Sequence, residues 1–88
     1  LNLLSRTMTG ADFMEYGYIR VKVEEMRLKK GISKNKLCHA AELERKQLNA
    51  YCREDIVRVD LGVLARICTA LDCSVNDLLE FVPGKEIL

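Results

Sequence analysis

The chain has 88 residues, of which 49% are hydrophobic, which is enough for one small domain with a modest core. Its 14 Lys and Arg residues nearly balance its 13 Asp and Glu residues, so the net charge of +1 does not by itself indicate a polyanionic partner. No apolar run approaches the roughly 20 residues that span a bilayer, and we therefore expect a soluble, cytoplasmic protein with no membrane partner.

Residues 1–18 are predicted to form an N-terminal arm, interpreted as a short helix or partly as a cloning remnant. The segment from Thr9 to Asp12 has the spacing of a capping box, which would open a short helix that Gly17 ends.

The next segment has a pattern that fits two kinds of structure. Ile19, Val21 and Val23 alternate with charged residues as in a strand, but Ile19 and Val23 are also at helix spacing with Met26. We predict a helix over residues 20–30, because strong helix formers fill its second half.

Two short helices are predicted to follow. Ser33 can cap the first of them, and the second covers residues 44–53. Leu48 and Tyr51 lie three residues apart in the second helix, and we expect both in the core, with the Tyr51 hydroxyl at its rim rather than stacked on a base. The opposite side of this helix is polar and basic, with Arg45, Lys46, Asn49 and Arg53.

The C-terminal half predicts two further helices. Asp60 can cap a helix whose apolar stripe is Leu61, Leu64, Cys68 and Leu71. Ser74 opens a capping box for a final helix that contains Leu78, Leu79 and Val82 and ends at Pro83. We therefore place the domain at residues 19–83 and a C-terminal tail at 84–88.

Candidate catalytic and metal-binding groups are few. Adjacent helical residues such as Cys38 and His39 point about 100° apart and cannot converge as a catalytic pair. One histidine and no C-x-x-C pair do not provide the ligand spacing of a zinc site. We interpret the cysteines as reduced thiols, with Cys38, Cys68 and Cys73 in the core and Cys52 partly exposed, and we expect no enzyme activity, cofactor, metal or small-molecule substrate.

Two short helices, of which the second is basic on its outer side, match the arrangement that reads DNA. A helix about 10 to 12 Å across fits a major groove about 12 Å wide. Arg45 and Lys46 can donate to guanine and Asn49 can pair with adenine, whereas Lys34, Lys36, Gln47 and Arg53 are expected at the phosphate backbone.

These segments together resemble the lambda-repressor-like helix-turn-helix domains of the Cro/repressor (Xre) family. The resemblance runs from Arg20 to Val82 through GISKNKLCHAA, LERKQLNAY and DLGVLARICTALDCSVNDLL. It implies a compact, all-α, five-helix domain, transcriptional regulation, double-stranded DNA as a partner and a homodimer. By position, the family's base-reading residues fall on Glu44, Arg45, Lys46 and Ala50, and its phosphate contacts on Lys34 and Arg53.

The chain departs from the family pattern at the turn. Glu42 occupies a position where Gly is common, so it must adopt any strained backbone without Gly's freedom. Glu44 replaces the usual Ser or Thr cap and brings a negative charge towards the DNA, where it could accept from a cytosine amino group.

A helix-turn-helix module used mainly for protein contact, such as an antitoxin or a regulator subunit, is the alternative. The near-neutral charge and the apolar arm favour it, because exposed side chains there would mark a partner surface: Phe13, Met14, Tyr16 and Tyr18.

Overall fold

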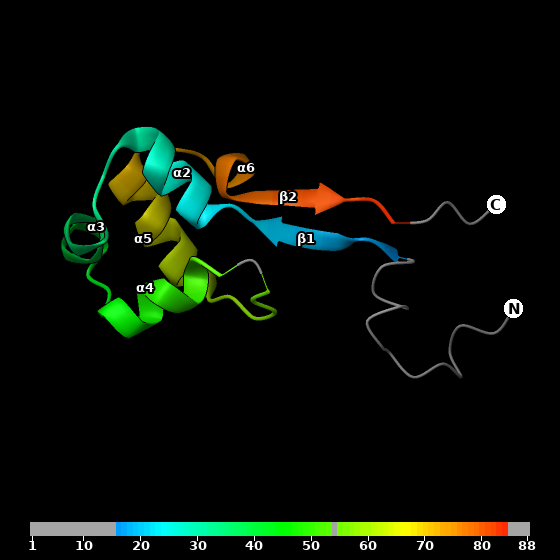
Figure 1. The fold of residues 1–88 in the computed structure, drawn as a ribbon, viewed down its shortest axis with the longest axis horizontal. Helices are drawn as coiled ribbons and strands as arrows, with labels where there is room; N and C mark the ends of the chain where they lie inside the picture. Colours follow the sequence, from blue (N-terminus) through cyan, green and yellow to red (C-terminus); the bar gives the residue numbers. More distant parts are fainter. Residues whose placement is uncertain (1–15, 54, 85–88) are drawn as a thin grey trace, which may run out of the picture.

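The helices gather at one end of the molecule, and a two-stranded ribbon extends from them (Figure 1). The computed structural model describes residues 16–53 and 55–84. The elements within them, in chain order, are β1 (Tyr18–Val21), α2 (Val23–Lys30), α3 (Lys34–Ala41), α4 (Arg45–Tyr51), α5 (Leu61–Leu71), α6 (Val75–Leu78) and β2 (Leu79–Val82). The five expected helices are present in this part of the chain, but three of them, α2, α4 and α6, are shorter than predicted.

The five-helix part of the fold prediction is confirmed, but the ribbon means that the domain is not strictly all-α. β1 and β2 pair antiparallel, with Ile19 opposite Phe81 and Val21 opposite Leu79. The alternating pattern of residues 19–23 therefore indicates a strand that ends at Val21. Helix α2 begins at Val23 and not at residue 20 as predicted. The final helix likewise ends at Leu78, because the residues after it supply the backbone partners of β1.

Gly17 allows the two ends of the ribbon to approach closely. Its φ is +88°, and a Cβ atom built there would lie 2.4 Å from the carbonyl oxygen of Val82. Only glycine fits this position without a shift of the backbone. The short helix expected before it, with Phe13 and Met14, lies outside the described residues.

The core forms where α3, α4 and α5 meet under α2 and α6. Leu37, Leu48, Ile67 and Leu78 are fully buried, each on a different helix. The predicted stripe of α5 is wrong at Leu61, which is 77% exposed; the buried residues of this helix are Val63, Leu64, Ile67 and Leu71. The helix is rotated towards Val63 and Ile67, so Leu61 in its first turn faces solvent.

Three predicted helix caps are confirmed. The Ser33 hydroxyl accepts from the Lys36 N–H, and the Asp60 carboxylate accepts from the N–H groups of Gly62 and Val63. Ser74 and Asp77 form the reciprocal capping box of α6. These caps satisfy N–H groups that the first turn of a helix leaves without partners, which is why the three helices begin there.

All four cysteines are free and half-buried. The predicted distinction between three core thiols and a more exposed Cys52 is therefore absent.

The division of the chain into an N-terminal arm, a domain of residues 19–83 and a C-terminal tail remains a prediction.

Candidate nucleic-acid interface

Helix α4 has one buried side and one exposed side. Leu48 is fully buried and Tyr51 is 6% exposed, as predicted. The Asp60 N–H donates to the Tyr51 hydroxyl at 2.6 Å, which ties the end of α4 to the start of α5. The inner side of α4 is thus fixed to the core, and the remaining side chains face outward.

The predicted base-reading residues lie on this outward side. Glu44, Arg45, Lys46 and Asn49 are exposed, and Ala50 is half-buried. Glu44 is the N-cap residue of α4, and its side chain makes no capping hydrogen bond, so the carboxylate is available to other partners. An exposed, polar, basic surface of this kind can enter a major groove.

Two hydrogen bonds connect α4 to the first turn of α3. Arg45 Nη2 donates to Asn35 Oδ1 at 2.5 Å, and Lys34 Nζ donates to Asn49 Oδ1 at 3.2 Å. Both side chains keep further hydrogen-bond donors. The Arg45 guanidinium has five N–H groups, and the Asn49 amide uses only its oxygen in this contact, so both of its N–H groups stay available. The contacts orient the side chains while leaving hydrogen-bonding capacity for DNA.

Asn35 is a residue that the sequence reasoning missed. It lies between Lys34 and Lys36, which were both predicted as phosphate contacts, but an asparagine inside a helix carries no signal of its own. Its exposed amide now lies beside Arg45 on the same surface.

The predicted phosphate contacts flank this surface. Lys36 and Gln47 are exposed and Lys34 is half-buried. Arg53 is also exposed, but its Nε lies 3.3 Å from Asp55 Oδ1, so an acidic neighbour partly neutralises it. Because both side chains are largely exposed, water screens this pair and it is weak.

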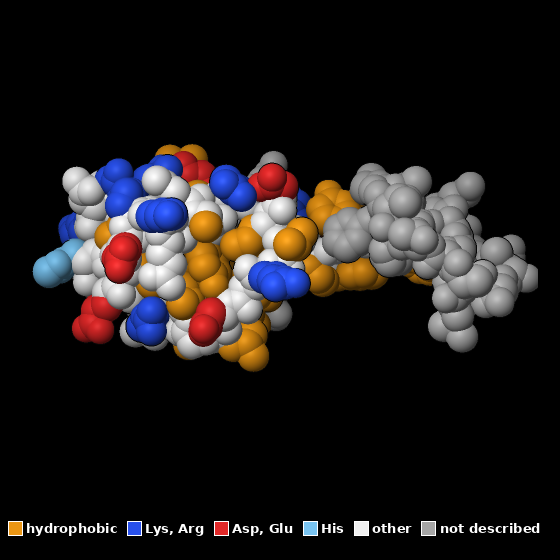
Figure 2. All heavy atoms as spheres, turned by 90° about the horizontal axis from the view of Figure 1, so that it is seen from below, with side chains coloured by type: hydrophobic (Ala, Val, Ile, Leu, Met, Phe, Trp, Pro, Cys, Tyr) orange, Lys and Arg blue, Asp and Glu red, His pale blue; other side chains and the backbone are white. Residues whose placement is uncertain are grey.

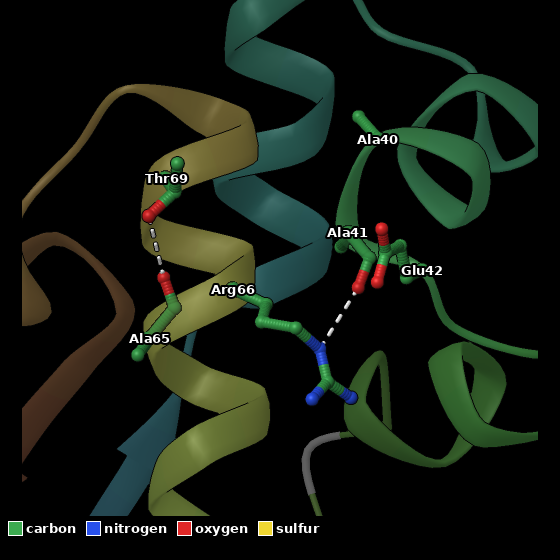
Figure 3. A pocket seen from close by; sticks show the side chains of 6 residues that line it. All are labelled: Ala40, Ala41, Glu42, Ala65, Arg66 and Thr69. Atoms are coloured by element: carbon green, nitrogen blue, oxygen red, sulfur yellow. Dashed lines mark hydrogen bonds between the residues drawn. The ribbon is translucent and has the colours of Figure 1, made fainter.

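The turn between α3 and α4 holds these helices at a fixed angle. Glu42 adopts the left-handed conformation, with φ 55° and ψ 49°, as its place in the turn predicts. Arg66 of α5 donates from Nε to the carbonyl oxygen of Ala41 at 3.0 Å, across a small pocket between α3 and α5 (Figure 3). This bond satisfies a carbonyl at the end of α3 and fixes that end against α5.

A partly buried ion pair supports the other side of the motif. Arg27 donates to both carboxylate oxygens of Glu24, at 2.8 and 2.7 Å, and to the carbonyl oxygen of Ile32 at 2.8 Å. Hydrogen bonding from Arg27 lowers the pKa of Glu24 to about 2. Glu24 also lines a small pocket together with Cys52, the residue that ends α4. Burial, with help from this carboxylate, raises the pKa of Cys52 to about 11. The cluster therefore links α2, the start of α3 and the end of α4.

The surface is not uniformly basic. Figure 2 shows Lys and Arg side chains interspersed with Asp and Glu over the helical end, and hydrophobic side chains gathered towards the ribbon. There, the ribbon and the loop after α4 form an apolar groove of about 290 Å³, lined by Ile19, Val21, Ile56, Val57, Val59 and Leu79. Phe81, on the same face of the ribbon as Ile19, is 61% exposed beside it.

A comparison with models of protein families shows to which family this domain belongs. Residues 22–84 match the model of the Cro/C1-type helix-turn-helix DNA-binding domain. The chain belongs to this family. The match covers the α3–α4 pair whose outward side is described above, and it confirms the resemblance seen in the sequence.

Individual relatives agree with this assignment of the Cro/C1-type domain. The chain is 39% identical over 61 residues to an SPbeta prophage-derived uncharacterized HTH-type transcriptional regulator, YopS, of Bacillus subtilis (strain 168), which covers 67% of this chain and 80% of the relative. It is structurally similar to the restriction-modification controller protein C.AhdI from Aeromonas hydrophila, with a TM-score of 0.57, 27% identity and coverage of 76% and 96% of the two chains.

The family is one of DNA-binding domains rather than enzymes. Within the described residues, no cluster of three or more His, Cys, Asp or Glu side chains has the arrangement of a metal site. Over the same stretch, none of the helices has the length and apolar character needed to cross a membrane.

Proposed function

We propose that this Cro/C1-type domain is a sequence-specific transcriptional regulator that inserts α4 into the major groove of double-stranded DNA. The observation that supports it most directly is the division of α4 into a buried side, with Leu48 and Tyr51, and an exposed side that carries Arg45, Lys46 and Asn49. The relative YopS is described as a transcriptional regulator, which favours the same role for this chain.

The chemistry of each side chain supports a role for it on the DNA. Arg45 and Lys46 donate to guanine, Asn49 pairs with adenine, and Glu44 accepts from a cytosine amino group. Ala50, half-buried on the same helix, packs against a thymine methyl group. The phosphate contacts come from Lys34, Lys36, Gln47 and Arg53, whose ion pair with Asp55 is weak enough to open.

We test this proposal by selecting binding sites from a pool of random duplexes and measuring affinity at several salt concentrations. Affinity for the selected site should fall steeply as salt rises, because bound phosphates release counterions. Arg45→Ala should weaken the selected site by about 1–3 kcal/mol and relax base preference at one position.

The matched control is Lys29→Ala. It also removes one exposed cation, but from the last turn of α2 and not from the α3–α4 surface. If both variants lose the same affinity, or if the salt response is flat, α4 is not the reading helix.

A homodimer is part of this proposal. Exposed apolar side chains lie along the ribbon and the loop after α4: Ile19, Val57 and Phe81. Monomers seldom leave a continuous apolar surface open to water. In a dimer built there, two copies of α4 about 34 Å apart would reach successive major grooves, and light scattering after gel filtration should give twice the chain mass.

The same surface favours a second candidate, a module that binds another protein. Phe81→Lys would disrupt a partner at the ribbon, whereas Val75→Lys changes an exposed apolar residue on α6. A monomer that fails to select any duplex, yet loses a protein partner through Phe81→Lys alone, would support this candidate over DNA reading.

A further inference from the structure

Helix α5 ends in a motif that brings two cysteines together. The Cys73 N–H donates to the Cys68 carbonyl at 3.0 Å and the Asp72 N–H to the Thr69 carbonyl at 3.3 Å, with Asp72 left-handed at φ 52°. This is the Schellman arrangement, in which the side chains of the first and last residues commonly contact each other. Here both of those residues are cysteines.

The backbone geometry sets an upper limit on the separation of the two residues. The 3.0 Å hydrogen bond, with the covalent bonds on either side of it, limits the distance between the two Cα atoms to about 7 Å. Disulfides join Cα atoms about 4.4 to 6.8 Å apart. Both side chains also pack against the core.

We propose that Cys68 and Cys73 form a redox-sensitive dithiol, which small disulfide compounds oxidise to an intramolecular disulfide without unfolding the protein. One protein thiolate attacks the small disulfide, forms a mixed disulfide and releases one small thiol. The second cysteine then attacks the protein sulfur of that mixed disulfide and releases the other small thiol. Two protein thiols lose two hydrogen atoms, and one small disulfide is reduced to two thiols.

The surroundings of Cys73 slow attack by this thiol at neutral pH. Burial raises the pKa of Cys73, and Cys68 and Asp77 raise it further, while Lys30 of α2 opposes them. A small thiolate fraction slows the attack. The rate of closure should therefore increase as the pH rises.

The position of the pair separates this chemistry from DNA binding. Cys68 and Cys73 lie at the C-terminal end of α5, whereas α4 is tied to the N-terminal end of α5 through Tyr51 and Asp60. The bridge would restrain the unfolded chain and raise the melting temperature by about 5–10 °C. The affinity for a selected duplex should not change.

The experiment treats the full reduced chain with cystamine at about pH 9, where more of the Cys73 thiol is ionised than at neutral pH. Intact mass should fall by two hydrogen atoms, and digestion should yield a peptide that links Cys68 to Cys73. The Cys38→Ser/Cys52→Ser double variant should close in the same way, whereas Cys73→Ser and Cys68→Ala should each fail to close while keeping their helical circular dichroism.

Several results would overturn the proposal. Stable addition of cysteamine to single cysteines would show that the two sulfurs cannot meet, and linkage of another pair would assign the chemistry elsewhere. A lower melting temperature of the oxidised protein would mean that the bridge forms only when the end of α5 unfolds. None of these results depends on whether the chain binds DNA.

Discussion

Replacing Glu42 by glycine should stabilise the protein. Glu42 ends α3 in the left-handed conformation at φ 55°, and its side chain is exposed. A residue with a Cβ atom pays about 1–2 kcal/mol for this conformation, whereas glycine loses roughly 0.5–1 kcal/mol more backbone entropy on folding. The net gain for Glu42→Gly is about 0.5–1 kcal/mol.

Urea denaturation followed by far-ultraviolet circular dichroism measures this difference. Glu42→Ala is the matched control, because it removes the same charge but keeps the Cβ atom, and it should show no gain. Asp72→Gly, at the equivalent left-handed position of α5, should gain less, because a short Asp side chain can bond its own backbone there. If Glu42→Gly is no more stable than Glu42→Ala, the turn is not strained and this reasoning fails.

Two other predictions concern the contacts that support α4. Tyr51→Phe should lower the free energy of unfolding by about 1 kcal/mol, because the Asp60 N–H loses its acceptor; an unchanged urea midpoint would exclude this bond as a support. Glu24→Gln should cost about 1 kcal/mol at neutral pH, a value reduced for solvent screening of a half-exposed carboxyl. The folded pKa of Glu24, about 2, lies below its ordinary value of 4.5, so the ion pair stabilises the fold above that ordinary value and the stability is lost as the pH falls towards 2. The two proteins should therefore converge in stability across that window, and a constant difference would contradict the assignment.

The starts of α3, α5 and α6 were predictable because each depends on a local chemical event. Ser33 and Asp60 accept from N–H groups two or three residues away, and the Asp77 carboxylate accepts from the Ser74 N–H. Such contacts can be read from sequence spacing. The burial of Leu48 and Tyr51 followed from helix periodicity in the same way.

The ribbon could not be predicted by these means. The strand around Ile19 needs a partner about 60 residues away, near Phe81, and neither segment indicates that partner by itself. The prediction used helix propensity for residues 20–22, but pairing with a distant strand decides the structure of this segment. A similar limit applies to Leu61, whose exposure depends on how α5 is rotated against the core.

The surface of α4 was predictable as a set of residue types, but its contacts were not. The hydrogen bond between Arg45 and Asn35 joins residues on different helices, and it depends on the angle at the Glu42 turn. Spacing along one helix cannot report that angle, so Asn35 was missed although its neighbours were chosen.

Backbone amide chemical shifts, measured during titration with a duplex selected by the protein, test the central claim most directly. Insertion of α4 predicts that the largest shifts fall on Arg45, Lys46 and Asn49 and on the first turn of α3, while Lys29 at the end of α2 stays unchanged. Shifts that fall instead on the ribbon around Ile19 and Phe81, with α4 unaffected, would contradict it.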